Sequence, residues 1–114
     1  MSDFQDFLKH QYVHVATGEF KDGKFSEAQA LYEQAVSTYS EGFKGAYLLR
    51  EPGTDRGMSV IFWESVDQMD SSNHDAAYLT ILKKMSPLFA HPPTTSLYEV
   101  VSTLDPSDRE LIGN

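Results

Sequence analysis

Residues 57–75 (GMSVIFWESVDQMDSSNHD) limit most strongly what this chain can fold into. Residues 60–63 are apolar in succession, whereas a strand with one solvated face would alternate apolar and polar residues. This pattern is typical of a strand that is buried on both faces. Helices can cover one face of its sheet, so a further layer must cover the other.

Three more strands and two helices are predicted around this central strand. Strand formers and turn residues predict strands at residues 12–21, 43–51, 59–65 and 96–102, the middle two joined as a hairpin. A capping box at Ser26 and Gln29 opens the first helix, and Gly42 follows it as a left-handed cap. The apolar face of this helix recurs at three- and four-residue spacing: Ala28, Leu31, Tyr32, Ala35, Val36 and Tyr39.

The second helical region follows the third strand directly. Ser65 and Gln68 form another capping box, and the polar residues 70–73 interrupt the helix, so Ser72 or Asn73 is expected to cap a second segment. Pro87 ends that segment. Its apolar stripe is Tyr78, Ile81, Leu82 and Met85. The tail is expected to form one helical turn from Ser107.

The order βαββαβ predicts an α+β, ferredoxin-like fold with a four-stranded antiparallel sheet and both helices on one face. We expect one domain over residues 1–114, with a core at about 12–102, an N-terminal arm at 1–11 and a C-terminal tail at 103–114. The arm is either a short amphipathic turn, through Phe4, Phe7 and Leu8, or a disordered tail. Apolar residues on the open sheet face predict a homodimer through that face.

Composition excludes several classes of function. A formal net charge of −8 disfavours nucleic acid and an anionic membrane as partners, because the chain has too few basic side chains to neutralise their phosphate groups. The absence of cysteine excludes disulfides and thiolate catalysis. With neither a secretory signal nor a long apolar span, we expect a soluble cytoplasmic protein.

Several short motifs, in their order and spacing, resemble the antibiotic biosynthesis monooxygenase domain over roughly residues 12–102. They are residues 41–43 (EGF) with Gly45, residues 62–65 (FWES), His74, and residues 98–101 (YEVV). The resemblance implies a ferredoxin-like fold that pairs into a dimeric α+β barrel, with a cavity between sheet and helices in each subunit. Some members of that family oxidise aromatic substrates with O₂ and neither flavin nor metal, others degrade haem, and many have no known activity.

Haem degradation is not expected here. In the haem-degrading branch an asparagine on the first strand and a tryptophan and a histidine on the second helix carry the function. Alignment on Gly42, Phe43 and Trp63 places Ala16, Ser72 and Leu82 at those positions. All three are unsuited to that chemistry.

His74 is the predicted catalytic residue. Oxygenation without a cofactor needs a general base, a dry pocket and a donor for the developing oxyanion, and histidine titrates near neutral pH. Asn73 and Asp75 beside it could hold one tautomer and supply the donor. The alternative is a surface histidine in an Asn-His-Asp capping cluster.

The other predicted pocket residues are aromatic or lie on strands. Trp63 either stacks on an aromatic ligand or fills the core. His14 either points into the cavity, opposite Tyr47 or Tyr98, or is a hydrogen-bonded core group. His10 and His14 are spaced as metal ligands would be only on a helix, so we expect no metal site. The sequence contains no GxGxxG or P-loop pattern to hold nucleotide phosphates, and we expect no organic cofactor.

Two functions remain open from the sequence. The first is a cofactor-independent monooxygenase that acts on a small phenol- or hydroquinone-like substrate in an apolar pocket, with His74 as base. The second is a non-catalytic homodimer that binds a small ligand in that cavity, or a partner protein through the termini. The fold alone does not choose between them.

Overall fold

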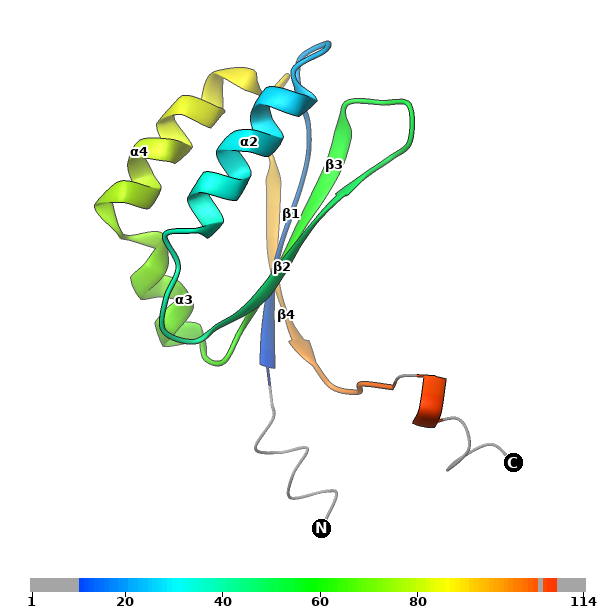
Figure 1. Cartoon of the computed structure of the whole chain (residues 1–114), viewed down its shortest axis with the longest axis vertical. Helices are drawn as coiled ribbons and strands as arrows, with labels where there is room; N and C mark the ends of the chain where they lie inside the picture. Colours follow the sequence, from blue (N-terminus) through cyan, green and yellow to red (C-terminus); the bar gives the residue numbers. More distant parts are fainter. Residues whose placement is uncertain (1–10, 105, 109–114) are drawn as a thin grey trace.

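The computed structural model describes residues 11–104 and 106–108 (Figure 1). Residues 1–10 of the arm predicted at 1–11 therefore lie outside the described residues, as does most of the C-terminal tail. The elements, in order, are β1 (Gln11–Glu19), α2 (Phe25–Val36), β2 (Phe43–Arg50), β3 (Arg56–Trp63), α3 (Val66–Asn73), α4 (Ala76–Met85) and β4 (Thr94–Val100). Short 3₁₀ turns lie at Ser86–Leu88 and Pro106–Asp108.

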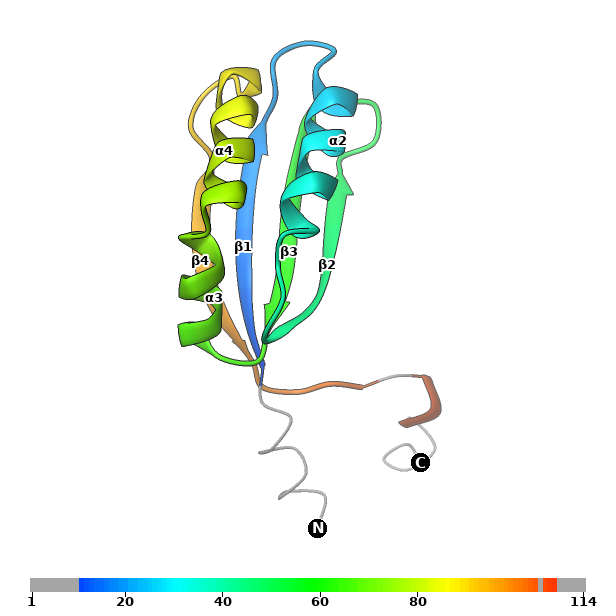
Figure 2. The same ribbon diagram turned by 60° about the vertical axis from the view of Figure 1, so that its left-hand side comes forward.

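The four strands form one antiparallel sheet in the order β2-β3-β1-β4. All three helices cover the same face of this sheet, as the two views in Figures 1 and 2 show. The predicted α+β, ferredoxin-like fold is confirmed, and so is the hairpin of the two middle strands. β1 is paired on both edges, whereas β2 and β4 are the edge strands.

The first helix begins differently from the prediction. It starts at Phe25 with Lys24 as the N-cap residue, and no side chain caps it. Ser26 therefore lies inside the first turn and cannot cap it. The physical reason is burial: Phe25 is 4% exposed and belongs to the core, which fixes the helix start one residue earlier.

The second helical region divides in two, as predicted, but at a different residue. The Ser65 hydroxyl caps α3 by accepting a hydrogen bond from the backbone N–H of Gln68 at 3.2 Å, which confirms the predicted start of this helix. Asp75, not Ser72 or Asn73, caps α4 by accepting from the amides of Ala77 at 2.8 Å and Tyr78 at 3.2 Å. The negative charge of an aspartate at this position is also stabilised by the positive end of the helix dipole.

Gly42 was predicted to cap the first helix, but α2 already ends at Val36. Gly42 does adopt a left-handed conformation, with φ of 80°, in the turn that leads into β2. Its carbonyl accepts a hydrogen bond from the Glu64 amide at 2.7 Å. The glycine therefore lies in the turn between α2 and β2 instead of at a helix terminus, and its bond to Glu64 links the start of β2 to the end of β3.

The core forms two clusters beneath the helices. One joins Phe20 and Phe25 to Ala28, Met85 and Leu88, near the start of α2. The other joins Ile61 and Trp63 to Met69 near α3. Trp63 is only 1% exposed and is the largest fully buried side chain among the described residues.

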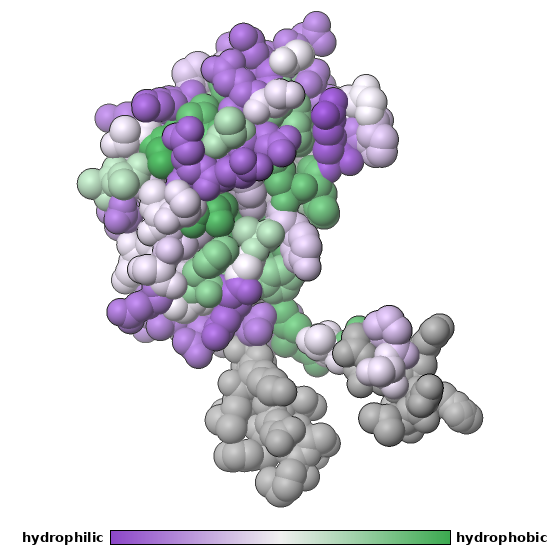
Figure 3. Space-filling model, viewed as in Figure 1, coloured by the Kyte–Doolittle hydropathy of each residue, from purple (hydrophilic) through white to green (hydrophobic). Residues whose placement is uncertain are grey.

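The face of the sheet turned away from the helices is apolar. We call this surface the open face; its side chains, identified by the cross-strand register, include Tyr47, Leu49, Met58, Val60, Phe62 and Tyr98. Tyr47 is 62% exposed and Tyr98 58% exposed. Figure 3 shows hydrophobic residues along this side of the sheet, while the outer surface of the helices is largely hydrophilic. Such a surface is typical of a protein interface.

None of the described helices combines the length and the apolar character that crossing a membrane requires.

Candidate functional site

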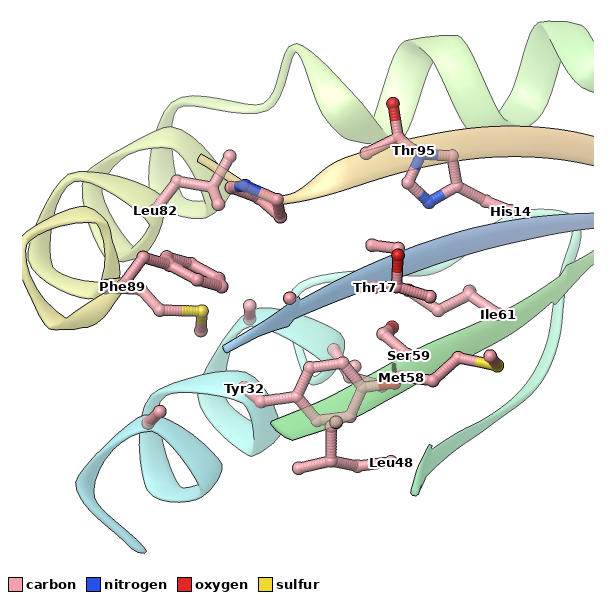
Figure 4. A pocket seen from close by; sticks show the side chains of 18 of the residues that line it. His14, Thr17, Tyr32, Leu48, Met58, Ser59, Ile61, Leu82, Phe89 and Thr95 are labelled. Carbon is pink, nitrogen blue, oxygen red and sulfur yellow. Dashed lines mark hydrogen bonds between the residues drawn. The ribbon is translucent and has the colours of Figure 1, made fainter. Parts of the chain in front are cut away.

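A cavity of about 420 Å³ lies between the sheet and the helices. Residues of both core clusters line it, including Phe20 and Met85 from one and Ile61 from the other. Its volume lies within the range of small-molecule sites, about 300–1,000 Å³. Figure 4 shows strands forming its floor and α2 and α4 forming its walls.

The floor is made of cross-strand rows on the helix-facing side of the sheet. His14 pairs with Ile61 of β3 and Leu97 of β4. In the next row Ala16 lies between Ser59 and Thr95, and beyond it Gly18 pairs with Gly57. The small side chains in the Ala16 row leave room above the sheet for the cavity, whereas the Phe89 and Phe25 rings pack directly over Gly18 and Gly57.

The lining carries almost no charge. Among the described residues that line the cavity there is no Asp, Glu, Lys or Arg, and His14 is the one side chain that could become positively charged at neutral pH. Most of the surface is aliphatic or aromatic. Such a lining favours an uncharged, apolar ligand, because a buried charge without a partner is costly.

His14 is the basic group of this cavity. It extends from β1 beside Thr95 of β4 (Figure 4) and is half-buried. Burial lowers the pKa of the His14 imidazole, so the ring is neutral at pH 7 and able to accept a proton. Its side chain makes no hydrogen bond to any other described residue, which leaves both ring nitrogens to a ligand.

Asn73 supplies a polar amide to the same cavity. It is the last residue of α3 and lines the cavity near the break between α3 and α4. Like His14, its side chain has no hydrogen-bond partner within the described part of the chain. An unsatisfied amide facing an apolar space is a natural donor to a ligand oxygen.

Three tyrosines on or just after the helices also line the cavity. Tyr32 donates a hydrogen bond to the backbone carbonyl of Tyr47 and accepts one from Ser59, each at 3.1 Å. Tyr39, just past the end of α2, and Tyr78 of α4 lie with ring centroids 5.5 Å apart. The sequence placed all three on inward-facing helical stripes, but periodicity predicts burial and does not reveal an empty space beside them.

His74 does not lie at this cavity. It is exposed at the C-terminal end of α3, and its Nδ1 lies 2.7 Å from the backbone oxygen of Asp70. The cause is the capping by Asp75, which directs His74 outward in the turn between α3 and α4. The structure places His74 on the surface, as in the alternative given for it above. Its catalytic role stays a prediction, and this geometry does not favour it.

The remaining predicted site residues divide between the core and the open face. Trp63 is packed edge-on against Tyr39 and Phe43 and does not line the cavity, so it fills the core. Tyr47 pairs with Val60 and Tyr98 pairs with Val13, which places both tyrosines on the open face. Of the predicted set, the structure brings only His14 and Asn73 together at the cavity.

No group of three or more histidine, cysteine, aspartate or glutamate residues among the described residues is arranged to hold a metal ion.

Comparison with known proteins supports the fold. No protein-family model matches the sequence, and no curated protein does. Among solved structures, SnoaB, a cofactor-independent oxygenase from Streptomyces nogalater, solved as a variant, matches with a TM-score of 0.74 and 18% identity, over 82% of this chain and 96% of that chain.

Two further structures belong to proteins provisionally assigned as antibiotic biosynthesis monooxygenases. One, from Chloroflexus aurantiacus, has a TM-score of 0.73 and 14% identity, over 83% of this chain and 97% of that chain. The other, from Bordetella bronchiseptica, has a TM-score of 0.70 and 24% identity, over 81% of this chain and 98% of that chain. At these identities the likeness shows a shared fold, and at that level the resemblance found in the sequence is confirmed.

Proposed function

We propose that this protein is a monooxygenase of the antibiotic biosynthesis type, which oxidises a small phenol- or hydroquinone-like substrate with O₂ and no flavin or metal. The observation that carries this proposal is a neutral, unpartnered His14 at the floor of an uncharged cavity. The shared fold with SnoaB, itself a cofactor-independent oxygenase, adds support.

The chemistry requires a base because the substrate itself supplies the electrons. His14 removes a proton from a ring methylene or hydroxyl group, and the resulting anion reduces O₂ and forms a carbon–oxygen bond to it. The peroxide then accepts the proton from His14. Its O–O bond breaks as the second proton leaves the same carbon, and the departing hydroxide takes up that proton and leaves as water. A methylene becomes a carbonyl, so one oxygen atom enters the product and the other leaves in water.

Asn73 is proposed to bind a substrate oxygen on which negative charge develops. Its amide N–H can donate to that oxygen, and the apolar surroundings strengthen such a bond relative to water. The cavity walls serve a second purpose, because excluding water protects the carbanion and the peroxide from side reactions.

We further propose that two copies of the chain associate through the open face. Tyr47, Leu49, Met58 and Tyr98 are all substantially exposed there, and a second copy would bury them. The cavity lies on the other side of the sheet, so each subunit would retain a complete site. A cytoplasmic location remains a prediction from composition.

One observation favours a second candidate function, a non-catalytic dimer that binds a small ligand. No described side chain holds His14 in a fixed orientation, whereas catalytic bases are commonly oriented by a neighbour. A binding protein would need the same apolar cavity and no oriented base.

The test is oxygen uptake by metal-stripped, flavin-free protein across a panel of hydroquinones and anthrone-like phenols. His14→Gln and His74→Gln are compared in parallel, since both remove an imidazole but only one removes it from the cavity. We expect uptake by the native protein and by His74→Gln, with at least a 100-fold loss in His14→Gln, in line with general-base catalysis of roughly 10²–10⁴.

Loss of activity in His74→Gln alone would instead support the role predicted from the sequence. If the native protein binds these phenols without consuming oxygen, the ligand-binding dimer becomes the better account.

A further inference from the structure

The pair formed by Tyr39 and Tyr78 is the part of the cavity that the proposed reaction has not used. One ring comes from the segment just after α2 and the other from α4, and their centroids are 5.5 Å apart with an angle of 37° between the planes. Both residues line the cavity.

Counting protons shows that this pair has at least one hydrogen bond to give. Two phenol groups carry two O–H protons, and even a hydrogen bond between them would use only one. No described residue accepts the other proton. Whichever tyrosine donates within the pair, one O–H therefore remains for a ligand in the cavity.

Tyr78 is the member of the pair that is better placed to donate to a ligand. The Tyr39 ring packs against Phe43 and Trp63 as well as Tyr78, whereas Tyr39 is the one aromatic ring in contact with Tyr78 among the described residues. We therefore take the Tyr78 hydroxyl as the donor.

Tyr32 differs from this pair in the use of its hydroxyl proton. Its hydroxyl donates to the carbonyl of Tyr47 and accepts from Ser59, so its one proton is already used within the protein. Tyr32 lines the same cavity but has no hydrogen bond to donate to a ligand. The two sites therefore differ in chemistry although both are tyrosines.

The sheet register places the pair close to His14. Tyr39 packs on Trp63, which pairs with Tyr12 on β1, and His14 lies two residues further along the same face. Neighbouring rows on one face of a sheet are about 7 Å apart. A single aromatic ring can therefore reach from His14 to the tyrosine pair.

We propose that Tyr78, positioned by Tyr39, is a phenolate-binding residue that donates a hydrogen bond to the ionised oxygen of an aromatic ligand held beside His14. This inference rests on the proposed function, since it names the oxygen that the cavity must stabilise after His14 takes a proton.

The experiment measures the pKa of 4-nitrophenol bound to the full-length protein, because its phenolate absorbs visible light and no turnover is needed. Nitrobenzene, which lacks the hydroxyl group, serves as the matched ligand. The variants are Tyr78→Phe and Tyr39→Phe, which keep both rings, with Tyr98→Phe as a control on the open face.

We expect Tyr78→Phe to raise the pKa of bound nitrophenol by about one unit, a tenfold loss of phenolate affinity, as for one hydrogen bond to an anion. Tyr39→Phe should raise it by a smaller amount, and Tyr98→Phe should leave it unchanged. Nitrobenzene affinity should remain the same in all variants, which a merely structural role for Tyr78 would not allow.

Three results would overturn the proposal: no saturable binding of nitrophenol, an unchanged pKa in Tyr78→Phe, or an equal loss of nitrobenzene affinity. If Tyr78→Phe does not fold, a pKa that rises when nitrophenol binds to the native protein decides against it. The shift does not depend on oxygen chemistry, so a protein that shows it without consuming oxygen loses the proposed function and keeps this subsite.

Discussion

The phenol ring of Tyr39 meets the indole of Trp63 edge-on, with ring centroids 4.8 Å apart and planes at 67°. Phe43 meets the same indole at 5.8 Å and 63°. This aromatic cluster fixes the end of α2 against β3, and so fixes one wall of the cavity. Its geometry makes Trp63 a support for the site and not a part of it.

Replacing Trp63 with alanine should therefore cost about 3–5 kcal/mol of unfolding free energy, the usual cost for a fully buried large aromatic residue. Urea denaturation followed by circular dichroism measures this, since the variant lacks the chain's one tryptophan. Trp63→Phe, which retains an aromatic ring, should lose less. A loss below about 1 kcal/mol for the alanine variant would contradict the packing described.

The pH dependence of stability should carry a contribution from His14. Burial lowers its pKa in the folded protein from 6.5, so below that pH the unfolded chain binds more protons and folding is weakened. The contribution of neutral, buried His14 to the unfolding free energy is fully present above about pH 6.5. It is lost as the pH falls through and below this value. Unfolding free energies at about pH 7.5 and about pH 5 should differ less in His14→Gln than in the native protein.

His74→Gln is the matched variant for this measurement, since its ring lies on the surface. It should keep the native difference between the two pH values. Equal behaviour of the two variants would remove His14 as the cause.

Filling the cavity should separate binding from stability. Ala16 lies at the centre of the floor, between Ser59 and Thr95, so a larger side chain there enters the empty space. Ala16→Leu should abolish nitrobenzene binding, as measured by calorimetry, while the unfolding free energy falls by no more than about 1 kcal/mol. A variant that still binds nitrobenzene at native affinity would show that the ligand site lies elsewhere.

A charge on the open face should dissociate the proposed dimer. Tyr47→Lys places an ammonium group in the middle of an apolar surface, where its desolvation opposes association. Sedimentation should show a dimer for the native protein and a dissociation constant raised at least about tenfold for the variant.

Leu79→Lys is the control for that measurement. Leu79 is an exposed leucine of similar character, but it lies on α4 on the other side of the sheet. Dissociation by both substitutions, or a monomeric native protein, would contradict an interface at the open face.

The fold could be predicted from the sequence because its signals are local and repeated. Consecutive apolar residues marked β3 as a buried strand, and three- and four-residue spacing marked α2. The order of elements then left few topologies for an antiparallel sheet. Boundaries moved by a few residues where burial outweighed local signals, as at Phe25.

The site was harder to predict because a shift of one residue along a strand or helix changes the direction in which a side chain points. Tyr47 and Tyr98 were expected opposite His14, but each pairs in a row that alternates with the His14 row, and one residue along a strand changes the face. On a helix each residue turns by about 100°, so a cap at Asp75 instead of Asn73 redirects His74 to solvent. The Tyr39–Tyr78 pair joins residues far apart in the chain, which no local pattern connects.

The central position of β1 has a consequence for how a ligand reaches the cavity. β1 is hydrogen-bonded along both edges, so the strand that carries His14 belongs to the part of the protein that opens most slowly. The helical walls have no such double pairing. We therefore expect ligands to enter by motion of α2 and α4 over the more rigid floor, and we expect ligand binding to slow amide hydrogen exchange at Tyr78 far more than at His14.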